Sequence, residues 1–259
     1  MRPTLLALFF LMLVGCGNKG GFSERKTEGQ TGYLTYCIGA TPTTYDPARV
    51  QDIDTNDILK NIYEPLVDYD ENGKLIGVVA RSWEISADGK TYTFKTSFSP
   101  FHNGEPAGAE DVKHSFERAL SSELASPTAE TYLGDIVGSD EVIKGTAKEL
   151  SGIKVIDPMT VEIKIKQPIP YFLGKLTYAC AAIVPRTTGN AEISDVSRAI
   201  GTGPFKLATI KPEVEVLLSR FDEYPRGKAK IEGIRRRIVK DPATRLNLFR
   251  TGETHICGV

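Results

Sequence analysis

The sequence predicts an α/β protein from its apolar pattern, and its composition and charge exclude several other classes. Short runs rich in apolar, β-branched and aromatic residues, such as Tyr33–Ile38, are separated by segments whose apolar residues recur at helical spacing. Apolar residues make up 41% of the 259 residues and charged residues 25%, which argues against a disordered, collagen-like or coiled-coil chain. Lys and Arg number 32 against 33 Asp and Glu, so the chain offers no general electrostatic footprint for nucleic acid.

The N-terminal segment resembles a bacterial lipoprotein signal. Leu5–Val14 is an apolar run too short to span a bilayer, and Leu13-Val14-Gly15-Cys16 is similar to a lipobox. The resemblance implies that residues 1–15 are a cleaved signal peptide. It also implies that a diacylglycerol on the Cys16 sulfur ties the protein to a bacterial membrane, facing the periplasm or the cell exterior. Residues 16–31 would form a flexible leash. A plain signal peptide, or a buried helix start with a chance Cys, is the alternative.

The first elements of the body are predicted to be a strand and a helix. Tyr33–Ile38 is typical of a buried strand, and a loop containing Pro and Asp follows it. Asp54-Thr55 can cap a helix that ends at Pro65. One face of this helix would carry Ile58, Leu59 and Ile62.

Two hairpins and a longer helix are predicted next. Residues 83–85 and 92–94 alternate on either side of Asp88-Gly89, a strong hairpin signal. Gly108–Leu120 shows the apolar spacing of a helix, with acidic residues in its first turn. Residues 153–156 and 161–165 flank Asp157-Pro158 and form the second hairpin.

The C-terminal third is predicted to add three strands and a helix. The strands are Cys180–Val184, which we expect to be buried, and then Val214–Ser219 and Ile234–Val239. Asp241-Pro242 is typical of a helix start, with Pro at the first helical position. The helix that follows would have an apolar face formed by Leu246 and Phe249 and would end at Gly252.

Candidate chemical motifs are few, and we expect no enzyme, cofactor or metal site. Residues 201–204 (Gly-Thr-Gly-Pro) lack the rest of a phosphate or dinucleotide motif and predict a tight turn before a strand. His255 and Cys257 are only two potential ligands, which do not make a zinc site. His102 is expected to hydrogen-bond rather than to hold a ligand. Arg235–Arg237 is expected to be the solvated face of a strand rather than a nucleic-acid patch.

Three cysteines remain once Cys16 is lipidated. They are Cys37, Cys180 and Cys257. An odd number allows at most one disulfide within the chain, and the sequence leaves its pairing open.

Six blocks of sequence, in order, resemble the family 5 extracellular solute-binding proteins, the oligopeptide-, dipeptide- and nickel-binding components of ABC importers. The similarity extends from about Tyr33 to the last residue. Features around residues 126–127 and 168–172 are most similar to the oligopeptide-binding branch. The six blocks are Thr44–Ala48, Asn61–Val67, Ala80–Phe94, Phe101–Val112, Gly201–Leu207 and Arg245–Glu253.

The resemblance implies an α/β fold of the periplasmic-binding-protein type II kind, in the three-lobe architecture of family 5. Residues 32–64 and 172–259 would form the first, ligand-binding lobe, which would be incomplete. Residues 65–171 would form the lobe inserted within it. The third lobe has no counterpart here, because family members are longer. We therefore expect the chain to be a fragment or a prematurely terminated product.

The resemblance also implies a function and a site. A monomer would capture a peptide by hinge closure and deliver it to a membrane permease with its ATPase. The expected ligand is an oligopeptide. In this family the segment after the Asp-Pro pair supplies backbone contacts to the ligand, by strand addition. Here those residues are Gln51, Asp52, Ile53 and Asp54; an ordinary loop leading to the helix cap is the alternative. Thr128 stands where oligopeptide binders can present an aromatic residue to the ligand.

The sequence leaves two other functions open. The protein could be a nickel- or haem-binding importer component, or a surface sensor or adhesion protein that uses the same fold. With only one of the two ligand-binding lobes, a bound peptide would remain exposed to solvent and its terminal charge would be unpaired. We therefore expect this chain alone to bind peptide weakly or not at all.

Overall fold

The structure is a computed structural model that describes residues 32–258. The predicted signal peptide, Cys16 and the whole of the predicted leash (residues 16–31) lie outside the described residues. The strands are β1 (Tyr33–Ile38), β2 (Val67–Tyr69), β3 (Leu75–Gly77), β4 (Ala80–Ile85), β5 (Thr91–Thr96), β6 (Ser99–Pro100), β7 (Pro106–Ala107), β8 (Ile153–Asp157), β9 (Thr160–Lys164), β10 (Phe205–Lys211), β11 (Glu215–Arg220) and β12 (Gly233–Ile238). The helices are α1 (Ile53–Leu59), α2 (Ala109–Leu120), α3 (Ala129–Leu133), α4 (Ser139–Ile143), α5 (Phe172–Lys175) and α6 (Pro242–Arg250), with short 3-10 turns η1 (Ala179–Ala181), η2 (Arg186–Thr188) and η3 (Val196–Arg198).

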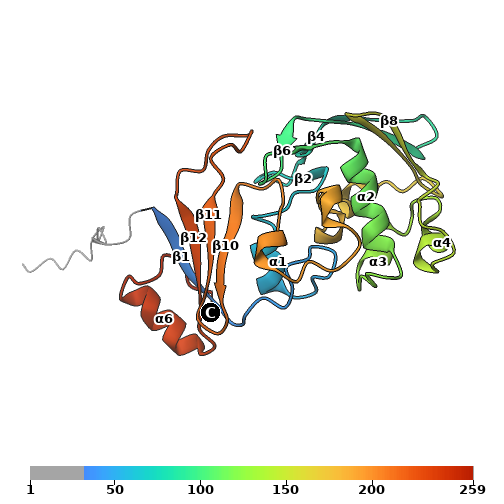
Figure 1. Cartoon of the computed structure of the whole chain (residues 1–259). Coiled ribbons are helices and arrows are strands. Elements are labelled where there is room, and N and C mark those ends of the chain that lie inside the picture. The colour runs from blue at the N-terminus through green and yellow to red at the C-terminus, as the bar shows by residue number, and fades with distance from the viewer. Residues whose placement is uncertain (1–31, 259) are drawn as a thin grey trace, which may run out of the picture.

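One part of the molecule, which we call the mixed-sheet unit, is built on four strands in the order β1-β12-β11-β10 (Figure 1). β1 and β12 are parallel, with Tyr33 opposite Gly233 and Ile38 opposite Ile238, whereas β11 is antiparallel to both of its neighbours. Apolar side chains of the sheet and of α1 pack into one core. Its fully or nearly fully buried members include Ile58, Leu59, Ile62, Val216 and Leu218.

The other part, the antiparallel-sheet unit, is built on strands in the order β4-β5-β9-β8, with α2 packed against β8 and β9. Both predicted hairpins and the predicted 108–120 helix are confirmed. Tyr92 and Phe94 are buried in this second core, and Trp83 lies half-buried opposite Phe94 on the neighbouring strand. Alternation of apolar and polar residues therefore placed one face of each hairpin correctly.

Residues 179–184 lie between the two cores, and the strand predicted at Cys180–Val184 is wrong. The segment forms η1 and then irregular chain that belongs to no sheet. Ala179 and Ala182 pack into the core of the mixed-sheet unit, whereas Cys180 and Ile183 pack into the other core. Burial from two sides explains the apolar run without any strand partner.

The start of α1 also differs from the prediction. Asp52, not Asp54-Thr55, is the N-cap: its carboxylate accepts from the Thr55 backbone N at 2.8 Å. The helix ends at Leu59, well before Pro65.

The C-terminal helix and the arginine strand need smaller corrections. Asp241 caps α6 as predicted, accepting from the Thr244 backbone N at 2.7 Å. Leu248 is the buried residue of that helix, whereas Phe249 is 46% exposed. Arg236 is buried rather than solvated: its guanidinium lies 4.5 Å from the Tyr36 ring centre and donates to the Asp57 carbonyl at the end of α1.

Between residues 32 and 258, none of the helices combines the length and the hydropathy needed to cross a bilayer.

Candidate functional site

The carboxyl ends of β1 and β12 meet at one edge of the mixed sheet. Ligands of open α/β sheets commonly bind where parallel strands end. Four segments gather there, and we call them together the open edge: residues 39–43, 51–54, 212–214 and 239–241. The backbone N of Val239 donates to the Ile38 carbonyl at 2.9 Å, which keeps the two strand ends together.

The tip of the β10–β11 hairpin is tied to this edge by polar contacts. The backbone N of Glu213 donates to the Thr41 hydroxyl at 3.0 Å, and that hydroxyl donates to the Glu213 carboxylate at 3.1 Å. The same carboxylate pairs with Lys240 at 2.6 Å, and these interactions hold the pKa of Glu213 below its usual range. The hairpin tip therefore has a fixed place beside the loop after β1.

The carboxylates of Asp52 and Asp54 are used within the chain. Asp54 accepts from the Gly39 backbone N at 3.0 Å, and Asp52 accepts from the Thr43 hydroxyl at 2.8 Å as well as from Thr55. Partial burial alone would raise the pKa of Asp52, but these hydrogen bonds outweigh it and the pKa is lowered. Both side chains therefore position the segment.

Two side chains of the segment, and one on the hairpin tip, face solvent. Gln51 is exposed, and the Ile53 side chain is 79% exposed. On the hairpin tip Val214 is 57% exposed. Asp52 has extended backbone dihedrals (φ −105°, ψ 154°), but Ile53 and Asp54 already belong to α1. Strand-like pairing is therefore restricted to the beginning of the predicted segment.

Thr128 lies in a different environment from residues 51–54. It precedes α3, and its buried hydroxyl lies near the thiol of Cys180, a residue of the antiparallel-sheet core, without a hydrogen bond of normal geometry. Burial raises the pKa of that thiol to about 12, and the Thr128 hydroxyl partly offsets the effect. The two groups of predicted site residues are therefore linked only indirectly, through the loop at residues 124–128.

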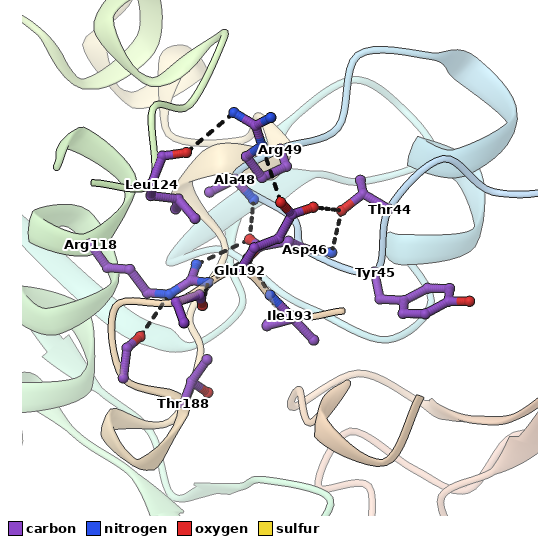
Figure 2. A network of polar contacts seen from close by, with 12 residues as sticks. Thr44, Tyr45, Asp46, Ala48, Arg49, Arg118, Leu124, Thr188, Glu192 and Ile193 are labelled. Atoms are coloured by element: carbon purple, nitrogen blue, oxygen red, sulfur yellow. Dashed lines mark hydrogen bonds and ion pairs between the residues drawn. The ribbon is translucent and has the colours of Figure 1, made fainter. Parts of the chain in front are cut away.

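A buried ion pair anchors the loop that leads to residues 51–54 (Figure 2). Asp46 and Arg118 are fully buried, and the guanidinium binds both carboxylate oxygens. The remaining Arg118 donors reach the carbonyls of Gly189 and Ala191, while Asp46 also accepts from the Ile193 backbone N at 2.9 Å. Three segments that are distant in sequence therefore meet at one charged pair.

Further hydrogen bonds widen this anchor (Figure 2). Thr44 donates to Glu192 at 3.0 Å, and Arg49 donates to the Leu124 carbonyl at 3.2 Å. Ser126 donates to the Ala48 carbonyl at 2.5 Å, which joins the 124–128 loop to the loop after β1. The open edge consequently has a rigid base that includes α2 of the other unit.

Sequence reasoning missed Arg118 and Glu192. The sequence does carry one signal for Arg118. Asp111, Ser115 and Arg118 follow helical spacing on α2, and all three are buried. A polar stripe beside an apolar face predicts buried hydrogen bonding, although it does not name the partner.

A cavity of about 220 Å³ lies between the two units, lined by residues of both. Its wall carries two acidic residues, Glu64 and Asp68. Glu64 accepts from the Tyr224 hydroxyl at 2.6 Å, from Thr202 at 3.2 Å and from Arg226. Burial raises the pKa of Glu64, and these partners oppose that shift. Because the Glu64 carboxylate is already paired, a ligand in the cavity would contact mainly apolar and aromatic side chains.

His102 and the turn at residues 201–204 have structural roles. His102 hydrogen-bonds as predicted: Gly201 N donates to Nδ1 at 3.3 Å, and Nε2 lies 2.9 Å from the Gly203 carbonyl. The turn predicted at residues 201–204 is confirmed, since β10 begins at Phe205. Within residues 32–258, no three His, Cys, Asp or Glu side chains are grouped to hold a metal ion.

A family model described as bacterial extracellular solute-binding proteins, family 5 Middle, matches residues 74–259. A putative ABC transporter peptide-binding protein of Brucella ovis is 32% identical over 204 residues, which cover 75% of this chain and 36% of that protein. The glutathione-binding protein GsiB of Pectobacterium atrosepticum is 28% identical over 220 residues, covering 84% of this chain and 40% of that protein.

Solved structures share the fold. Haemophilus influenzae OppA in complex with the peptide RPPGFSPFR superposes with a TM-score of 0.80 at 25% identity, covering 87% of this chain and 45% of that one. The substrate-binding domain of an oligopeptide ABC transporter from Bacillus anthracis gives a TM-score of 0.81 at 27% identity, covering 86% and 44%. The chain thus spans less than half the length of these relatives.

Proposed function

This chain belongs to the family 5 bacterial extracellular solute-binding proteins, and we propose that it forms part of the peptide-binding component of an ABC importer. Its α/β fold is part of the type II periplasmic-binding-protein fold, as the superposition on OppA shows. Peptide-binding relatives and a peptide-bound neighbour support the choice of ligand class.

The observation that carries the proposal is the open edge on its anchored base. It presents Ile53, Val214 and the extended backbone near Asp52 to solvent, and the Asp46–Arg118 pair fixes the loop behind them. Main-chain pairing at Gln51 and Asp52 would bind any peptide backbone, whereas apolar contacts would tolerate many side chains. Broad acceptance of peptide sequences follows from this chemistry.

The division into lobes is part of the proposal. Residues 32–64 and 172–259 would act as one jaw, and residues 65–171 as a buttress inserted within it. Two separate cores support this division, with residues 172–184 contributing to both. A peptide would be captured by hinge closure between the open edge and a further jaw. Thr128 would contribute through the 124–128 loop, because its hydroxyl is buried.

The cellular setting is also proposed. Lipid on Cys16 would hold a monomer at a bacterial membrane, facing the periplasm or cell exterior, where a permease with its ATPase receives the peptide. The peptide-binding ABC transporter relatives support the envelope location and the transport partners.

A ligand-class titration tests the proposal. Calorimetry of the 259-residue chain with tripeptides and nonapeptides should give saturable but weak binding, with Kd of about 0.1–1 mM, or roughly −5 kcal/mol. The same titration with Ni²⁺ or haem should give no saturable binding. Saturable binding of Ni²⁺ or haem that is tighter than the binding of peptides would overturn the proposal.

A further inference from the structure

Cys37 and Cys257 lie on neighbouring parallel segments. The chain after α6 returns along β1, where Tyr36 and Ile256 form a parallel bridge and the His255 backbone N donates to the Thr35 carbonyl at 2.7 Å. Residues in register on parallel strands point to the same side of the sheet. Cys37 and Cys257 each follow the bridged residue by one position, so their side chains are neighbours on one face.

The spacing of such a pair suits a disulfide. Neighbouring strands lie about 4.8 Å apart, and disulfides join Cα atoms about 4.4–6.8 Å apart. Both cysteines are half-buried and both thiols are free in this structure. Burial raises the pKa of Cys37, the guanidinium of Arg237 opposes the shift, and the charge of the Cys257 thiolate adds to it. That mutual influence agrees with side-by-side thiols.

We propose that Cys37 and Cys257 are a redox-sensitive pair whose disulfide pins residues 254–258 to β1. One thiolate attacks a sulfur of a small-molecule or protein disulfide and expels one thiolate from it. The second cysteine thiolate then attacks the mixed disulfide and expels the other. The oxidant gains two electrons and leaves as two thiols, while the two cysteines lose their protons and form one S–S bond.

Cys180 is excluded from this pairing by its place in the fold. It is 2% exposed in the core that includes the antiparallel sheet, and burial raises its thiol pKa to about 12. A buried thiol that stays protonated attacks disulfides slowly. Cys180 therefore serves as an internal control in any oxidation experiment.

The segment carrying Cys257 is held by few other contacts. Arg237 pairs with Glu253 at 3.0 Å, and the Thr35 backbone N donates to Nδ1 of His255 at 2.9 Å. Ile256 is 49% exposed. A covalent bond at this position would change how firmly the segment stays on the sheet, which gives the pair a structural consequence.

Peptide mapping after oxidation tests the pair. The folded chain carrying Cys16→Ser is equilibrated with oxidised and reduced glutathione, alkylated, and digested with trypsin without reduction. The sequence places Cys37 in peptide 27–49, Cys257 in peptide 251–259 and Cys180 in peptide 176–186. We expect the amount of peptide 27–49 linked to peptide 251–259 to exceed the amount of any peptide linked to 176–186 by at least about tenfold. We also expect oxidation to raise the melting temperature by about 5–10 °C.

Variants separate this result from chance pairing. Cys180→Ser should leave the linked peptide unchanged, whereas Cys37→Ser and Cys257→Ser should each abolish it and the rise in melting temperature. The denatured chain should give mixed pairings, which shows that the fold makes the choice. A dominant link to 176–186, or only glutathione adducts on the folded chain, would overturn the proposal.

Discussion

Asp46 and Arg118 illustrate how one buried pair can organise several loops. Neither side chain meets solvent, and protein groups supply hydrogen bonds to both charges. Removing one partner of such a pair leaves an uncompensated buried charge, which costs far more than loss of a surface pair. The open edge depends on this pair because the loop behind it has no regular secondary structure.

Asp46→Ala should therefore lower the free energy of unfolding by about 3–5 kcal/mol. Urea unfolding measures the change. Asp140→Ala is the matched control, because Asp140 forms an exposed pair with Lys166 at 2.8 Å, and such pairs contribute little to stability. Equal costs for the two variants would show that the buried pair does not anchor the loop.

His102 makes stability depend on pH. Burial lowers its pKa to about 4, with Lys206 adding to the shift and the bond to Gly203 opposing it. The unfolded chain takes up the proton near pH 6.5, so it binds more protons than the folded chain between pH 6.5 and 4. The stabilising contribution is present above pH 6.5 and is lost as the pH falls toward 4.

The loss should amount to about 3 kcal/mol over that interval, at about 1.4 kcal/mol per pH unit. Urea midpoints of the parent and of His102→Gln, measured from pH 7.5 to pH 4, isolate the contribution. Asn103→Gln, which alters an exposed neighbour that does not titrate over this interval, is the control. A parent and a His102→Gln variant with parallel pH profiles would refute this assignment.

Partnerships between single residues were the least predictable feature of the site. Asp46 was recognised within a sequence block, but Arg118 lies 72 residues away and nothing local connects the two. The burial of Arg236 was missed for the same reason, since Tyr36 and the end of α1 meet it only after folding. Sequence periodicity locates a buried polar side chain but does not supply its partner.

At the scale of elements, α1 shows how a cap sets the position of the site. Asp52 binds the Thr55 backbone N and the Thr43 hydroxyl, so it fixes both the start of the helix and the preceding loop. N-cap side chains typically contribute about 1 kcal/mol. Gln51 and Ile53 flank this cap, and their placement follows from it.

Asp52→Ala should destabilise the protein by about 1 kcal/mol, and Asp52→Asn by only a few tenths. Hydrogen exchange should also show faster exchange at residues 53–56 in Asp52→Ala. Asp241→Ala, which removes the cap of α6, controls for general loss of stability and should leave exchange at residues 53–56 unchanged. Unaltered exchange in Asp52→Ala would mean that the cap does not position the segment.

Elements with local signals were predictable, and those without were not. The two hairpins carried their turn residues in the sequence, and α2 carried its apolar spacing. Cys180–Val184 had only an apolar run, which cannot distinguish a strand from chain buried between two cores. The Gly201 turn was predicted from its glycines, and the structure adds the reason: a Cβ there would lie 2.0 Å from the Ile62 carbonyl oxygen.

One buried anchor joins the two units of the molecule and leaves one edge of the mixed sheet open. The resemblance to a family predicted this class of fold, and comparison with OppA confirmed it. The sequence alone did not show that Val214 and Ile53 share an edge, because that depends on the Thr41–Glu213 contacts between distant segments. The site is therefore a product of topology more than of any motif.

If the proposed function is right, peptide contacts the open edge. Nuclear magnetic resonance of the ¹⁵N-labelled chain, titrated with a tripeptide to millimolar concentration, reports this contact residue by residue. Saturable shifts should appear at residues 39–43, 51–54 and 213–214. Ile53→Ser should weaken binding about fivefold through lost apolar burial, whereas Ile156→Ser, which changes a 49% exposed isoleucine on β8, should not. Shifts confined to the cavity around Glu64, or equal weakening by both variants, would contradict the account.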